Sequence, residues 1–317
     1  MNRLLFLFIL LSLTSLNLTA QECYSIQVKA VLMSKHEQGL ALYNQLKAKN
    51  YLVYYYQLPL NDAQWFRVRL GCFQTRATAK QFGNTLKQKE NLPFFVDDTP
   101  LFTDAYQDKF KVITTPSAIW LQTGSQNKIL HKFPGINELE MLQQTQGRIA
   151  PNGQAIVFYY DEKIFQVNLK TGLSEVLRPD VINAQPKWSF DSHYIGYLDN
   201  AQWEVETSLC VLKGENTCLV KNNAQTQKAV KSFQWHPHKN ILFFVEGHAY
   251  GTVSVGGNLY AVDRAAKRHD VVIAQTEHQE IGADFEIKKG FIYYNLYQFD
   301  DEYINKTVTP KKIKLPF

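Results

Sequence analysis

The sequence has few cysteines and few glycines, and its only long apolar run lies at the start of the chain. Four cysteines and 16 glycines occur in 317 residues. None of the cysteines stands in a CxxC pair or in the Cys/His spacing of a zinc site. With 45% hydrophobic and 20% charged residues, the composition excludes a disordered, collagenous or coiled-coil protein. The length predicts two domains.

Aromatic residues are abundant, and the charge is unevenly distributed. The chain holds 17 Tyr, 20 Phe and 5 Trp, which favours strand-rich domains over long helices. Of the formal charge of +5, residues 23–96 contribute ten Lys/Arg against three Asp/Glu, whereas residues 113–317 hold 21 of each. We therefore expect an anionic partner at the first of these segments.

The first twenty residues have the features of an export signal. Residues 1–3 supply a positive charge, residues 4–13 an apolar core, and residues 18–20 a cleavage site. The apolar run is short for a membrane span. Because Leu18, at the minus-three position, is a poor cleavage-site residue, an uncleaved membrane anchor is the alternative. No small-residue lipidation box precedes Cys23. These features predict a signal peptide over residues 1–20 and a periplasmic location in a Gram-negative cell.

Export permits disulfides, and the number of cysteines is even. Cys210 and Cys218 flank a strand-turn-strand pattern, which predicts a bond across a hairpin. Cys23 and Cys72 form the second predicted pair. Strict alternation points these two side chains to opposite faces, so their bond requires a twist or bulge near Gly71.

Residues 23–98 predict a βαββαβ unit of the α+β class. Alternation over residues 24–30 is typical of a half-buried strand, and Ser34 with Glu37 has the spacing of a capping box. We expect a four-stranded antiparallel sheet with both helices on one face and the other face open. The expected elements are strands at 51–58, 65–72 and 93–97 and a second helix capped by Thr75.

This segment resembles the SPOR (sporulation-related repeat) domain, an RNP-like fold. The resemblance rests on residues 24–28 (YSIQV), 41–49, 65–73 (WFRVRLGCF) and 77–87. Three positions depart from the family, since Lys29, Ala30 and Cys72 replace a usual glycine, serine and proline. The resemblance implies binding to peptidoglycan, with a preference for glycan strands whose stem peptides amidases have removed, and location at the division septum.

The chemistry of such a glycan agrees with the composition of the predicted open face. A denuded strand is a repeating array of lactyl carboxylates and amides, which calls for fixed cations, an amide side chain and flat aromatic rings. The resemblance places Gln27, Trp65 and Arg67 at recognition positions, and Ala30 lacks a commonly used hydroxyl. The candidate glycan-binding residues are Ser25, Gln27, Lys29, Tyr54, Trp65, Arg67 and Arg69.

Alternation also assigns the neighbouring aromatic positions, and each candidate has a simpler interpretation. Phe94 and Val96 are expected on the open face and Phe95 towards the helices. Arg67 and Arg69 can merely be solvated charges that protect the sheet from aggregation, and Trp65 can pack on the next domain. Aromatic and basic faces on this frame also bind single-stranded RNA, but the export signal argues against nucleic acid.

After a predicted linker at 99–112, residues 113–317 contain a loose repeat. Turns near Pro151, Phe190, Pro237 and Ile287, each close to apolar strands, lie 39, 47 and 50 residues apart. Such periods predict the blades of an all-β propeller, with five blades as the expected count. The turns resemble degenerate WD40-like repeats of TolB-type periplasmic propellers. Closure of the ring cannot be predicted from this pattern.

No arrangement in this half predicts catalysis. Residues 251–256 lack the spacing of a nucleophile elbow, and His236 and His238 stand in a repeat turn, which makes a metal site with His248 the weaker interpretation. We therefore predict a non-enzymatic envelope protein without cofactor or metal, whose propeller presents a surface to a protein partner. The alternatives are a cell-wall hydrolase with a SPOR targeting module and a catalytic propeller, and a scaffold whose basic sheet binds its own propeller.

Overall fold

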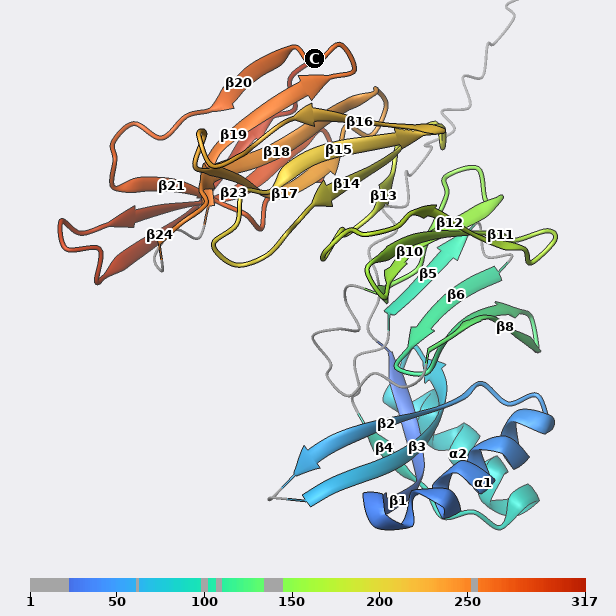
Figure 1. Ribbon diagram of the computed structural model, residues 1–317. Helices are drawn as coiled ribbons and strands as arrows, with labels where there is room; N and C mark the ends of the chain where they lie inside the picture. The colour runs from blue at the N-terminus through green and yellow to red at the C-terminus, as the bar shows by residue number, and fades with distance from the viewer. Residues whose placement is uncertain (1–22, 61–62, 98–101, 107–109, 134–144, 252–255) are drawn as a thin grey trace, which may run out of the picture.

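The computed structural model describes residues 23–60, 63–97, 102–106, 110–133, 145–251 and 256–317. The predicted signal peptide lies outside these residues. Figure 1 shows a small N-terminal domain, with two helices on one face of a sheet, followed by a fan of successive β-sheets.

The N-terminal domain has the predicted βαββαβ order. Its sheet order is β2-β3-β1-β4, and every neighbouring pair is antiparallel. The elements are β1 (Tyr24–Leu32), a 3-10 turn (Met33–Lys35), α1 (His36–Ala48), β2 (Val53–Leu60), β3 (Ala63–Phe73), α2 (Arg76–Glu90) and β4 (Phe95–Asp97).

The two helices begin differently, although both were expected to be capped. The Thr75 hydroxyl accepts a hydrogen bond from the Thr78 amide at 3.2 Å, and the two residues form a capping box. The expected box at Ser34 is wrong, because Ser34 lies within the 3-10 turn and no side chain caps α1. Both helices pack on a core that includes Ile26, Leu46 and the other members of one buried apolar cluster.

The first sheet of the second part begins inside the predicted linker. β5 (Phe102–Tyr106) pairs antiparallel with β6 (Phe110–Thr115), which continues into β7 (Ala118–Thr123) and β8 (Gln126–Lys132). The expectation of a plain connector over 99–112 is therefore wrong. Pairing with β6 satisfies backbone groups of β5 that a linker would leave to water.

Two further four-stranded antiparallel sheets follow. Their strands are β9 (Arg148–Ile149), β10 (Ala155–Tyr160), β11 (Lys163–Asn168) and β12 (Ser174–Arg178), then β13 (Lys187–Trp188), β14 (Ile195–Asp199), β15 (Ser208–Lys213) and β16 (Glu215–Val220).

The remaining strands form one eight-stranded sheet. They are β17 (Lys228–Trp235), β18 (Ile241–His248), β19 (Gly256–Asp263), β20 (Arg268–Val272), β21 (Gln279–Gly282), β22 (Glu286–Lys288), β23 (Phe291–Phe299) and β24 (Lys306–Lys314). β21 bridges β19 and β23, and so joins two units that the repeat pattern predicted to be separate blades.

A glycine permits that bridge. A Cβ atom on Gly256 would lie 1.9 Å from the Ile281 carbonyl oxygen, so only glycine allows the two backbones to approach this closely. Among the described residues, β5–β8 and β22–β24 belong to different sheets, and Figure 1 places them at opposite ends of the fan. Within the described ranges the structure therefore shows successive blade-like sheets that do not form a closed propeller.

The repeat appears as a repeated hydrogen bond between successive sheets. Trp188 Nε1 donates to the Arg148 carbonyl at 3.0 Å, and Trp235 Nε1 donates to the Lys187 carbonyl at 2.9 Å. These pairs are 40 and 48 residues apart, close to the predicted period. Each tryptophan on a first strand thus ties its sheet to the preceding one.

Candidate functional site

The candidate site is the face of the N-terminal sheet that lies opposite the helices. Its register is set by β3, which pairs with β1 on one side and β2 on the other. The cross-strand partners on this face are Arg69 with Gln27 and Tyr54, Arg67 with Ala30, Trp65 with Leu32, and Gln27 with Phe95.

One part of this face is accessible, and we call it the open-face strip. Gln27, Trp65 and Arg67 are half-buried there. Two apolar side chains stand clear of the core, because Leu32 is 41% exposed and Phe95 is 60% exposed. The members of the open-face strip are Gln27, Ala30, Leu32, Trp65, Arg67 and Phe95.

Two polar atoms of the open-face strip lack partners. Gln27 Oε1 and Arg67 Nε are buried and form no hydrogen bond within the described part of the chain. Leaving a buried polar atom unpaired costs about 1–3 kcal/mol. The amide oxygen accepts an N–H, and the guanidinium donates to a carboxylate or carbonyl oxygen. The two half-buried side chains therefore match, in chemical type, a ligand that carries both amides and carboxylates.

Three candidates lie on this face but at its covered end. Arg69 is 2% exposed, forms an ion pair with Asp97, and its Nη1 donates to Ser25 Oγ at 3.3 Å. Ser25 and Tyr54 are fully buried. The expectation that Ser25, Tyr54 and Arg69 are exposed contacts is therefore wrong. The carboxylate of Asp97, the cross-strand neighbour of Ser25, draws the guanidinium inward.

Lys29 also does not lie in line with Gln27 on the open face, although alternation predicted that it would. A register shift between Gln27 and Lys29 makes Lys29 the partner of Val68, which lies in the core beneath the helices. Ala30 takes the place beside Arg67 instead. Strict alternation from Gln27 cannot anticipate this shift, because a bulge adds one residue to one strand.

The β4 assignment is reversed relative to the prediction. Val96 packs in the helix-side core and is joined there by Phe94, whereas Phe95 points away from it. A Cβ atom on Gly83 of α2 would lie 2.3 Å from the Phe94 ring, so the glycine makes room for that ring. The sequence analysis missed Phe95 and Leu32. A three-residue strand provides too few positions for its alternation to be read.

The covered end is held by a predicted disulfide. Cys23 and Cys72 are bonded, with their Cα atoms 5.2 Å apart. The required bulge is present, since β3 has two residues opposite the single Ser25, and Gly71 has a φ of 75°. Tyr54 packs against the disulfide, which explains its burial. The prediction of both the bond and the bulge is confirmed.

The first sheet of the second part packs against this end. Leu52 of the N-terminal domain and Trp120 of β7 belong to one buried cluster, which also contacts Cys72. Asn127 Nδ2 donates to the Asn50 carbonyl at 2.9 Å across the same boundary. Among the described residues, the tryptophan in this cluster is Trp120, and no member of the open-face strip belongs to it.

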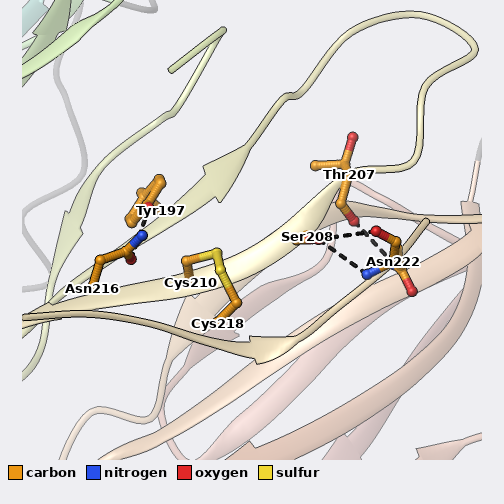
Figure 2. The surroundings of a disulfide bond; sticks show 7 residues. All are labelled: Tyr197, Thr207, Ser208, Cys210, Asn216, Cys218 and Asn222. Carbon is orange, nitrogen blue, oxygen red and sulfur yellow. Dashed lines mark hydrogen bonds between the residues drawn. A yellow bond between two sulfur atoms is a disulfide. The ribbon is translucent and has the colours of Figure 1, made fainter. Parts of the chain in front are cut away.

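The second predicted disulfide is also present. Cys210 and Cys218 are cross-strand partners in the β15–β16 hairpin, with a Cα–Cα distance of 3.8 Å (Figure 2). Asp199 lies near both sulfur atoms. Because these sulfur atoms are bonded to each other, they provide no thiolate for a metal.

His236, His238 and His248, which were considered as a metal site, do not all lie close together. His236 Nδ1 accepts the amide of His238 at 3.0 Å, which uses one ring nitrogen within the turn. His236 precedes β18 and His248 ends it, so a strand of 8 residues separates them. That length corresponds to about 25 Å. Most of the rejected elbow, residues 252–255, lies outside the described residues.

No helix in the described ranges has the length and apolar character that crossing a membrane requires.

Comparison with family models agrees with this geometry. The model of the SPOR domain matches residues 24–97. Residues 24–97 form a SPOR domain. A domain of unknown function (DUF4652) matches residues 207–314, which begin before β15 and end with β24. The SPOR domain and the two disulfides fit an exported, envelope-associated protein.

The chain is also similar to several solved structures at low identity. TolB from Acinetobacter baumannii is 11% identical with a TM-score of 0.41, over 88% of this chain and 69% of TolB. An oligogalacturonate lyase in complex with manganese is 13% identical with a TM-score of 0.42, over 67% of this chain and 62% of the lyase. Dipeptidyl peptidase 4 from Porphyromonas gingivalis is 10% identical with a TM-score of 0.43, over 66% and 37% of the two chains. No curated protein sequence matches the chain.

Proposed function

We propose that this protein binds denuded glycan strands of peptidoglycan through the open-face strip of its SPOR domain. The observation that carries the proposal is the pair of unpartnered buried atoms, Gln27 Oε1 and Arg67 Nε, beside exposed apolar side chains. A glycan strand without stem peptides presents N-acetyl amides and lactyl carboxylates, which match these two atoms in type.

The apolar members of the strip supply the second half of the recognition. Trp65 and Leu32 are cross-strand partners, and Phe95 stands beside Gln27 on the neighbouring strand. Flat or apolar side chains on both sides of a polar pair can lie against the apolar faces of sugar rings while the polar groups meet the substituents. A peptide-bearing strand would offer the same rings but no free lactyl carboxylate for Arg67.

Arg69 and Ser25 are positioning residues in this proposal. The ion pair of Arg69 with Asp97 links β3 to β4, and Ser25 lies between them on β1. This link holds Phe95, two residues before Asp97, at a fixed place relative to Gln27. Lys29 contributes positive charge near the strip rather than a direct contact.

We further propose that the protein acts at the septal wall as a binding protein rather than an enzyme. Septal amidases generate the denuded strands that the open-face strip fits. The fan of sheets, held against the covered end of the SPOR sheet, would present a surface to a second envelope protein.

Co-sedimentation with amidase-treated sacculi tests the binding. The variant Gln27→Ala/Arg67→Ala removes one neutral and one charge-assisted hydrogen bond, so binding should weaken about 100-fold. The matched control Lys80→Ala/Gln81→Ala removes the same two side-chain classes from the exposed surface of α2 and should pellet like the parent protein. Equal pelleting of the Gln27/Arg67 variant and the control would refute the proposal.

Two further measurements test the septal location and the lack of activity. A fluorescent fusion of residues 21–98 should concentrate at the septum, and a uniform envelope signal would contradict the location. Incubation of the purified chain with labelled peptidoglycan should release no fragments. Turnover would support the hydrolase alternative instead.

A further inference from the structure

A hollow of about 400 Å³ lies between the β13–β16 sheet and the β17–β24 sheet, far from the SPOR domain in sequence. The end of β16 forms one wall, and the opposite wall comes from β17, β18 and the β19–β20 hairpin. Pockets that hold small ligands begin at about 300 Å³. This hollow therefore has room for a ligand of about the size of one or two sugar units.

Its floor is a rigid ion pair. The carboxylate of Glu246 is 4% exposed and receives Arg268 Nη2 at 2.5 Å and Asn222 Nδ2 at 3.2 Å. The Arg268 guanidinium also lies 3.4 Å from the centroid of the Tyr260 ring. Contacts on two sides fix this guanidinium, so a ligand can meet its remaining N–H groups without further ordering of the side chain.

The lining carries an excess of positive charge. Lys221 and Lys228 both line the hollow, are exposed, and form no ion pair with any described residue. Together with Arg268 they provide three cations, whereas Glu246 is the one acidic residue in the lining. Since Glu246 is already paired, the net field in the hollow favours an anion.

The β16 wall is held in place by the neighbouring strand (Figure 2). The amide of Asn222 donates to Ser208 Oγ at 3.0 Å, and its side-chain Nδ2 donates to the Thr207 carbonyl at 3.0 Å. The Cys210–Cys218 disulfide fastens the same hairpin closer to its turn. Asn222 thus connects the fastened hairpin to Glu246 on the opposite wall.

We propose that this hollow binds a small solute that carries a carboxylate or a phosphate. Arg268 and the two lysines supply charge-assisted donors. The N–H groups of Asn222 are already used by Ser208, Thr207 and Glu246, so Asn222 holds the wall in place and does not contact the anion. The site shares no residue with the open-face strip, so this proposal does not depend on glycan binding by the SPOR domain. The disulfide acts on it as a positioning element.

Calorimetric titration of the full-length oxidised protein tests the proposal with three probes: inorganic phosphate, N-acetylmuramic acid and neutral N-acetylglucosamine. We expect saturable binding of phosphate or of N-acetylmuramic acid, and none of N-acetylglucosamine. Whichever anion binds more tightly identifies phosphate or carboxylate as the recognised group. Lys228→Ala should weaken that binding about tenfold, the equivalent of one charge-assisted contact.

The control variant is Lys170→Ala, which removes an exposed lysine from another sheet and should leave the affinity unchanged. Cys210→Ala/Cys218→Ala should weaken binding while circular dichroism shows an intact fold, because it loosens one wall. Absence of saturable binding of both anions at millimolar concentration would overturn the proposal. Equal affinities of the Lys228→Ala and Lys170→Ala variants would overturn it as well.

Discussion

The two disulfides should stabilise the protein by different amounts, and the difference follows from the chain that each one closes. Cys23–Cys72 spans 49 residues and joins β1 to the end of β3, whereas Cys210–Cys218 spans 8 residues within one hairpin. A cross-link lowers the entropy of the unfolded chain by a constant plus an amount that grows with the logarithm of the loop length. This relation gives about 4 kcal/mol for the longer loop and about 2.5 kcal/mol for the shorter one.

Burial raises the cost of losing the longer disulfide further. Cys23 is 7% exposed and packs with Tyr54, and Cys72 also contacts the cluster that joins the two parts of the chain. We therefore expect Cys23→Ala/Cys72→Ala to destabilise the SPOR domain by at least about 4 kcal/mol, the amount that follows from loop closure. Its open-face strip should lose order together with the domain contact.

Region-resolved hydrogen exchange in increasing urea measures this, because it separates the SPOR domain from the sheets that follow it. Peptides from β1 and β3 should lose protection at much lower urea in Cys23→Ala/Cys72→Ala than in the parent protein. In Cys210→Ala/Cys218→Ala, the change should be smaller and confined to β14–β16. Equal free-energy losses in the two variants, or a loss below about 1 kcal/mol for the longer loop, would refute this reasoning.

Three other predictions concern packing and charge. His131 lies among four aromatic rings with centroids 4.9 to 5.7 Å away, and burial lowers its pKa below 6.5. Neutral His131 therefore contributes its full stabilisation of the folded state above about pH 6.5, and this stabilisation declines as the pH falls and the ring must take up a proton. We expect acid to lower the melting temperature less in His131→Phe than in the parent protein. Asp97→Ala removes the carboxylate that pairs with the buried Arg69 guanidinium. We expect the free energy of unfolding to fall by about 2 kcal/mol, which is less than for a fully buried ion pair because Asp97 is partly exposed. Urea unfolding should show partial recovery in Arg69→Met/Asp97→Ala, and no recovery would exclude the ion pair as the cause. Trp188→Phe removes the indole N–H that ties two sheets and should cost about 1 kcal/mol, whereas Trp203→Phe, at an exposed position, should cost nothing measurable by calorimetry.

Local sequence patterns were sufficient to predict the secondary-structure elements in which the backbone follows a regular period. The alternation of β1 and the capping residue Thr75 of α2 predicted these two elements, and the order of elements predicted which face the helices cover. The turns near Phe190 and Pro237 likewise predicted a repeat. In the structure, the tryptophan two residues before each of them, Trp188 and Trp235, forms the same kind of hydrogen bond to the preceding sheet.

The site was predicted less completely, because several members depend on distant partners. The burial of Arg69 depends on Asp97, 28 residues later in the chain. The displacement of Lys29 depends on a bulge relative to β3, and the exposure of Phe95 depends on the room that Gly83 makes for Phe94. None of these contacts leaves a periodic trace in the sequence.

The sequence by itself determined the order of elements in the SPOR domain, both disulfide pairings and the sheet face on which the candidate site lies. These features follow from local periodicity, cysteine number and the geometry of an antiparallel sheet. Only the tertiary structure decided which residues of that face remain accessible, that a strand occupies the expected linker, and that the sheets of the described residues do not form a closed ring. Those outcomes depend on which surfaces far apart in the chain cover one another, and burial of that kind is a property of the folded whole.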